Sequence, residues 1–200
     1  MNKTVRSALV GAIIAALCTA AFAQTVRVRG TIEKADGNML TLKASNGEVK
    51  LTLTENALIV AVVKASLAEV KEGTFLGSAA MPQPDGSQKA LEVHIFPEQM
   101  RGTGEGHRPY APVQNSTMTN GSAAGATVSG VDGSTILLKY KDGEKKIIVP
   151  PNVPIVRYEI GDKGDLKPGT HFTVLAASKK PDGTLEAARI NVGRDGTVPQ

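Results

Sequence analysis

Cysteine and aromatic residues are scarce in this 200-residue sequence. Cys18 is the single cysteine, there is no tryptophan, and aromatic residues make up 4% of the chain. One cysteine excludes an internal disulfide and a cysteine-based structural zinc site. The few rings also leave little surface on which nucleic-acid bases could stack. Stability must therefore come from apolar cores.

Charge of one sign is not in large excess either. The 23 Lys and Arg residues exceed the 19 Asp and Glu residues by four, and the basic residues form no long cluster. A small net charge without a cluster does not favour a nucleic-acid or membrane-surface partner. We expect no nucleic-acid partner.

The long apolar stretch at the N-terminus is typical of an export signal. Lys3 and Arg6 precede the apolar residues 8–16, and Ala21-Phe22-Ala23 supplies the small residues that signal peptidase requires. We expect cleavage after Ala23, which removes Cys18, and a periplasmic or secreted protein. A membrane-spanning helix needs about 20 apolar residues, so the chain is not expected to span a membrane after cleavage.

Motifs of known catalytic sites are missing. The sequence contains neither a Gly-x-Ser-x-Gly elbow nor a His-Glu-x-x-His helix. The glycine-rich run 102–106 is followed by His107-Arg108-Pro109 and not by a helical pattern, so it does not predict a phosphate-binding loop. We therefore expect a protein that is not an enzyme.

Strand and turn signals fill the first half of the remaining sequence. Apolar residues alternate with polar ones from Val26 onward, and Asn46-Gly47 is a strong signal for a tight hairpin turn. Ser66 and Glu69 fit a capping box of a short helix. Two further strands, joined by Pro84-Asp85-Gly86, complete the order of a small barrel of the oligonucleotide/oligosaccharide-binding (OB) type. We assign this unit to residues 24–97.

The same pattern returns in the second half. Asp142-Gly143 lies 96 positions after Asn46-Gly47, and the hairpin within residues 167–192 repeats the one within 71–96. The sequence thus predicts an all-β fold of two tandem small OB-like β-barrels, each with five or six strands and one short helix, related by internal duplication. The second barrel is assigned to residues 126–194. Residues 98–125 are predicted to be a linker rich in Gly, Pro and polar residues, and residues 195–200 a C-terminal tail.

Two segments carry a family resemblance. Residues 167–192, from Lys-Pro-Gly through Pro-Asp-Gly-Thr-Leu-Glu-Ala to Arg-Ile-Asn-Val, and the linker residues 101–109 and 115–120 resemble an exported bacterial family of unknown function with tandem OB-like repeats. Relatives sometimes carry the label of a metal ABC transporter permease, which conflicts with the lack of a membrane span. The resemblance implies a fold and an envelope location, but no site residues.

Charged and aromatic residues set the linker apart from the two predicted barrels. We expect a non-catalytic binding or scaffolding protein of the bacterial periplasm, with an envelope component or a small ligand as its partner. The ligand is expected on a barrel face or in the groove between the two barrels, where the linker can close over it. The predicted ligand-binding residues are Arg101, Glu105, His107, Arg108, Tyr110, Arg27 and Arg29.

Two alternatives remain open. If the linker folds over the first barrel, His94, Glu98, Glu105 and His107 can converge on a divalent metal ion, as in an envelope metal-binding accessory protein. If the linker does not fold over the barrel, His94 and His107 are isolated surface histidines, with His94 on the outward face of its strand. The second alternative is an enzyme acting on envelope glycans, which paired carboxylates would permit.

Overall fold

The computed structural model describes residues 25–45, 47–129 and 133–200, without the side chains of residues 126–129 and 133. The expected all-β class is confirmed, because the described residues form twelve strands and three short 3₁₀ helices. The predicted leader 1–23 and the turn residues Asn46 and Asp132 lie outside the described residues. The strands are β1 (Thr25–Asp36), β2 (Met39–Ala44), β3 (Gly47–Lys64), β4 (Phe75–Pro82), β5 (Gln88–Ile95), β6 (Gly106–Pro109), β7 (Thr117–Ser129), β8 (Gly133–Tyr140), β9 (Gly143–Val149), β10 (Ile155–Ile160), β11 (His171–Lys179) and β12 (Leu185–Gly193). The 3₁₀ helices are η1 (Leu67–Glu69), η2 (Glu98–Met100) and η3 (Lys163–Asp165).

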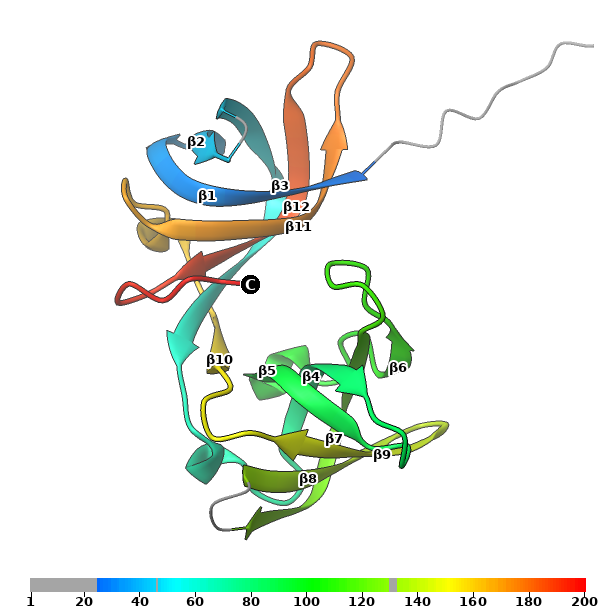
Figure 1. Ribbon diagram of the computed structural model, residues 1–200. Coiled ribbons are helices and arrows are strands. Elements are labelled where there is room, and N and C mark those ends of the chain that lie inside the picture. The colour runs from blue at the N-terminus through cyan, green and yellow to red at the C-terminus, as the bar shows by residue number, and fades with distance from the viewer. Residues whose placement is uncertain (1–24, 46, 130–132) are drawn as a thin grey trace, which may run out of the picture.

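Five strands pair in a closed circuit that we call the first ring (Figure 1). β1 pairs with β2 and β11, β3 pairs with β2 and β12, and β11 pairs with β12. Alternate residues of these strands point inward and form an apolar core that includes Leu42, Leu51, Phe172 and Ile190. Burying this alternating face is what holds the ring together.

A second ring has the same plan. β4 pairs with β5 and β7, β8 pairs with β7 and β9, and β5 pairs with β9. Its core includes Leu76, Val93, Ile136, Leu138 and Ile147. The two rings thus have separate cores.

The hairpins are exchanged between the two halves of the sequence, which differs from the sequence prediction. The hairpin β4–β5 was expected to complete the ring of β1, β2 and β3 within residues 24–97. Instead that ring takes its hairpin, β11–β12, from the second half, and β4–β5 joins β7, β8 and β9. The physical reason is β3, whose 18 residues extend for about 60 Å and carry the chain to the second ring before β4 begins.

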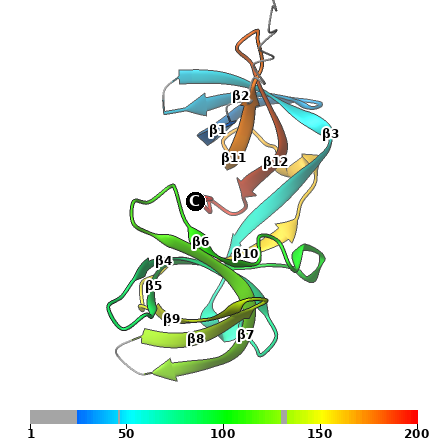
Figure 2. The ribbon, with the colours of Figure 1, turned by 90° about the vertical axis from the view of Figure 1, so that its right-hand side faces the viewer.

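β3 and β10 connect the rings and pair with each other in an antiparallel manner (Figures 1 and 2). Val62 pairs with Tyr158, and these two residues are 96 positions apart in the sequence. Other pairings repeat in both halves: Leu185–Leu51 matches Gln88–Ile147, and Ile190–Ile59 matches Val93–Ile155. The matching residues are 96 positions apart on β3 and 97 apart on the hairpin strands. The two halves are therefore related by an approximate twofold axis near Val62 and Tyr158.

The segment predicted as a linker, residues 98–125, contains regular structure. It forms η2, β6 and the first part of β7, and β6 pairs with β7. The expectation missed the strand because Thr, Ser, Gly and Asn dominate it in place of an apolar alternation. The second half therefore begins near Thr117, earlier than the predicted boundary at residue 126.

An ion-pair network fixes β10 and the end of β12. The guanidinium of Arg194 lies 2.8 Å from Asp165 and 2.6 Å from Glu159, and Arg157 joins Glu159 to Glu69. Hydrogen bonding to Arg194 lowers the pKa of Asp165 below its usual value.

The predicted C-terminal tail is attached to β11, since Thr173 Oγ1 donates a hydrogen bond to the carbonyl of Pro199. Among the described residues, no helix has the length and apolar character needed to cross a membrane.

Candidate functional site

A cleft of about 270 Å³ lies between the two rings. Arg27 and Arg29 of β1 form its side on the first ring, and Leu91 and Glu92 of β5 lie on the second ring. The loop between β6 and β7 closes it from another side. The remaining lining residues are Ala79, Tyr110, Pro112, Val113, Pro154 and Gln200.

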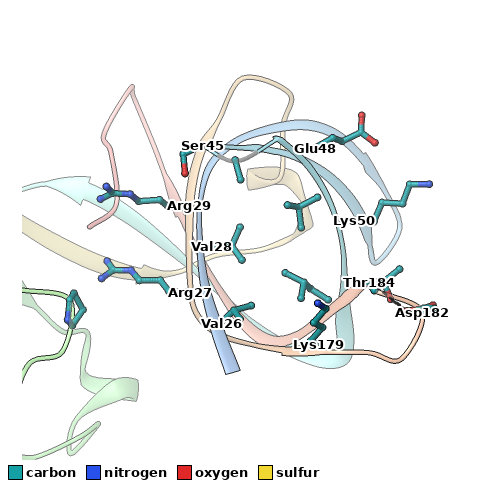
Figure 3. A pocket seen from close by; sticks show the side chains of 15 residues that line it. Val26, Arg27, Val28, Arg29, Ser45, Glu48, Lys50, Lys179, Asp182 and Thr184 are labelled. Carbon is teal, nitrogen blue, oxygen red and sulfur yellow. Dashed lines mark hydrogen bonds between the residues drawn. The ribbon is translucent and has the colours of Figure 1, made fainter. Parts of the chain in front are cut away.

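The two arginines reach the cleft because β1 alternates. Val26 and Val28 point into the first ring, whereas Arg27 and Arg29 point away from it, toward the loop of the other ring (Figure 3). Within the part of the chain that the structure describes, neither guanidinium forms an ion pair with a carboxylate. The Nε of Arg27 is also buried without a hydrogen-bond partner. A buried guanidinium nitrogen left unpaired costs free energy, which a bound acceptor would recover.

The loop of residues 110–116 is held in a compact shape. The backbone N–H of Tyr110 donates to the carbonyl of Ser116 at 2.9 Å, and the N–H of Ser116 donates to the carbonyl of Val113. The buried Ser116 hydroxyl donates to the same Val113 carbonyl at 2.6 Å. This loop presents Tyr110, Pro112 and Val113 to the cleft on a shaped support.

Tyr158 of β10 is the centre of an aromatic cluster next to the cleft. His94 stacks on its ring at 5.2 Å between centroids, and Phe96 meets it edge to face at 5.2 Å. Burial, and next the negative charge of Glu92, raise the pKa of Tyr158, while the cations Arg189 and Arg27 oppose this. The hydroxyl is therefore neutral at ordinary pH and can donate a hydrogen bond.

Equivalent positions of β5 and β12 place different charges against Tyr158. On β5, Glu92 Oε2 lies 3.1 Å from His94 Nε2, in ion-pair range although the hydrogen-bond geometry is poor. On β12, Arg189 Nε donates to Asn191 Oδ1 at 3.0 Å, and its guanidinium lies 5.7 Å from the Tyr158 ring centre. Burial lowers the pKa of Arg189. Glu92 and Arg189 occupy matching positions of the two hairpins, 97 residues apart. The second ring therefore places an acid beside Tyr158 where the first ring places a base.

The structure brings together three of the seven predicted ligand-binding residues, namely Arg27, Arg29 and Tyr110. Arg101 instead bonds Glu98 at 2.7 Å and the carbonyl of Gly73 at 3.0 Å. Arg108 donates to the carbonyl of Gly104.

The other two predicted residues, Glu105 and His107, also make contacts within the second ring. Glu105 accepts a hydrogen bond from the backbone N–H of Lys141 at 3.0 Å. His107 Nδ1 lies 2.8 Å from Thr119 Oγ1, and burial lowers its pKa. The seven side chains that were predicted to form one site therefore lie at several separate places in the structure.

The four residues of the predicted metal site contact different partners. His94 faces Glu92, Glu98 bonds Arg101, and Glu105 and His107 have the contacts described above. In the described residues, no group of three or more His, Cys, Asp or Glu side chains is placed to hold a metal ion. His94 is buried, contrary to the expected outward position, because β10 and its Tyr158 cover that face of β5.

Sequence reasoning missed Glu92, Arg189 and Gln200 as residues of this region. The first two carried a signal, since an acid and a base occupy matching positions of the repeated hairpins. Gln200 gave no signal, because its place depends on how the last residues attach to β11.

Comparisons with family models, with curated proteins and with solved structures gave no match. The resemblance to the exported bacterial family therefore stays a prediction.

Proposed function

We propose that this is a non-catalytic binding protein whose small ligand, with an anionic group and an apolar part, lies in the cleft between the rings. The observation that carries the proposal is the pair Arg27 and Arg29, which face the cleft without a carboxylate partner in the described residues. Guanidinium groups suit carboxylates and phosphates because they donate paired hydrogen bonds. Tyr110, Leu91 and Pro112 offer an apolar surface beside them.

We further propose that each ring is an OB-like barrel and that the two arose by internal duplication. The matching registers of the two rings support the duplication, and the closed circuit of five strands supports the barrel. The order β1–β3, η1 and the hairpin β4–β5 is followed in the second half by β7–β10, η3 and the hairpin β11–β12, where β9 and β10 correspond to the two parts of β3. Three strands, a short helix and a hairpin are the order of OB-type barrels. The leader-like residues 1–23 support export to the periplasm or beyond, with an envelope role.

No catalytic step is part of the proposal. Glu92 and His94 are an acid and a base that contact each other beside the cleft. Both are buried, and His94 stacks on Tyr158. We therefore assign both side chains to the fixed wall of the cleft, with Glu92 in its lining.

Native mass spectrometry of the protein purified from its own cells tests the proposal. We expect a bound mass that denaturation releases. In the variant R27Q/R29Q, two charge-assisted hydrogen bonds of about 1.5–3 kcal/mol each are lost, so occupancy should fall at least tenfold. The control R108Q/K71Q removes the same charge from exposed positions outside the cleft and should keep the mass. Equal occupancy in R27Q/R29Q, or no bound mass in the unaltered protein, would contradict the proposal.

A further inference from the structure

The second ring contains one strand, β6, that has no counterpart among the described residues of the first ring. β6 pairs antiparallel with residues 117–120 of β7, on the edge where β8 has not yet begun to pair. Glu105, just before β6, accepts a hydrogen bond from the Lys141 N–H in the turn between β8 and β9. β6 thereby fills the space between the start of β7 and that turn.

The matching edge of β1 lies open in the first ring. Gly30 pairs with Phe172 and Gly121 pairs with Leu76, so residues 26–29 of β1 correspond to 117–120 of β7. Residues 26–29 lie along β11 on one edge, whereas β2 pairs with β1 only from Gly30 onward. Over the described residues, no strand pairs with the other edge of 26–29. Such an edge presents backbone N–H and C=O groups to an incoming strand.

A cavity of about 900 Å³ opens beside this edge (Figure 3). Val26, Val28, Val49 and Leu185 give it an apolar lining. Ala44 borders it at the position where the second ring has the half-buried Tyr140.

The second ring closes the same end with polar side chains. There Thr117 Oγ1 donates a hydrogen bond to Gln88 Oε1 at 2.8 Å. Thr117 occupies the position that Val26 has in the first ring, and Gln88 occupies that of Leu185. The first ring is therefore open and apolar where the second is filled and hydrogen-bonded.

We propose that an extended acidic segment of a partner protein adds to β1 as an antiparallel strand along residues 26–29, in the place that β6 takes in the second ring. Strand addition supplies main-chain hydrogen bonds, and alternate side chains of the segment enter the cavity. The acidic character follows from the rim. Lys50, Lys179, Arg27 and Arg29 outnumber Glu48 and Asp182 there.

The contact of Glu105 with the second ring favours the same chemistry. Its carboxylate binds the backbone N–H of Lys141, which is 96 positions after Ser45. Ser45 lies at the rim of the cavity, so an acidic residue of the partner has a matching backbone group to bind.

Fluorescence anisotropy with a labelled peptide tests this proposal. The probe is acetyl-Gly-Glu-Val-Glu-Val-Glu-Tyr-amide, and its counterpart has lysine in place of each glutamate. We expect the acidic peptide to bind and the lysine peptide to bind at least tenfold more weakly. The variant K50E/K179E should weaken the acidic peptide at least tenfold, whereas K71E/K163E, which reverses exposed charges elsewhere, should not. Ala44→Tyr should also weaken it, because a large side chain at the border of the cavity leaves less room for the side chains of the segment.

Hydrogen exchange locates the bound peptide. Bound peptide should slow exchange of amides within residues 26–29 and leave those of β6 unchanged. Equal binding of the two peptides, or no added protection at residues 26–29, would overturn the proposal. Protection of this edge before any peptide is added would also overturn it, because a second copy or residues 1–24 would then be the occupant. Lys50 and Lys179 do not line the cleft between the rings, so failure here is distinguishable from failure of the proposed cleft ligand.

Discussion

A fragment of residues 24–97 is expected to fold as a dimer and not as a monomer. This segment holds β1 to β5, which the sequence alone presents as one complete barrel. In the structure the hairpin β4–β5 does not complete the ring of β1, β2 and β3 but forms part of the second ring. Two copies of the fragment can exchange their hairpins in the same way.

The β3–β10 pairing shows how the copies would meet. Val62 pairs with Tyr158, its counterpart at 96 positions, so two fragments can pair their β3 strands around Val62. Domain swapping of this kind requires little new surface, because each contact already exists within the chain. Sedimentation equilibrium should give twice the fragment mass together with a β-type circular dichroism spectrum. A folded monomer would contradict the hairpin exchange as the preferred pairing.

Gly30→Ala should destabilise the protein by about 3 kcal/mol, at the upper end of overpacking costs. A Cβ at this position would lie 1.9 Å from the carbonyl oxygen of Lys43, a backbone atom that can move only with β2. Gly121 has the same relation to Lys139 in the second ring, at 2.4 Å. Each glycine lies where a strand contacts neighbours on both edges, so its lack of a side chain lets the ring close.

The matched control for this variant is Gly86→Ala. Gly86 has a φ of 83° in the β4–β5 turn, and a Cβ there meets open space. The left-handed backbone should cost the alanine variant about 1 kcal/mol. Urea unfolding of both variants measures the difference in the free energy of unfolding. A loss for Gly30→Ala no larger than that for Gly86→Ala would show that β1 and β2 are not in close contact at Gly30.

The inward face of several strands could be predicted from the sequence, but the partner of each strand could not. Alternation identifies Val93 and Ile190 as inward residues of repeated hairpins, and both are buried in ring cores. The two hairpins have similar inward faces, so local pattern does not distinguish a hairpin that returns to its own half from one that is exchanged. The length of β3 decides this, and the sequence showed its second part as a separate apolar run.

The site was predictable to the same partial extent. Arg27, Arg29 and Tyr110 were expected because they are charged or aromatic residues in or near strands without other candidate site residues. In the structure they line the same cleft. His94 was expected on the surface, since alternation along β5 turns it away from the ring core. It is buried because the exchange brings Tyr158 of β10 against that face. Contacts between the two rings carry no local pattern, so the sequence did not predict them.

Cysteine cross-linking tests the hairpin exchange most directly. Ser78 of β4 and Thr119 of β7 are paired and buried, and paired residues of antiparallel strands lie within disulfide range. In a Cys18→Ser background, Ser78→Cys/Thr119→Cys should form a disulfide on mild oxidation. Peptide mass mapping should then show the link between positions 78 and 119.

The control pair joins Ser78 to Val28, which occupies in β1 the place of Thr119 in β7. If each half kept its own hairpin, positions 28 and 78 would be neighbours. Hairpin exchange predicts a link in 78/119 and none in 28/78. A link in 28/78 with none in 78/119 would contradict it.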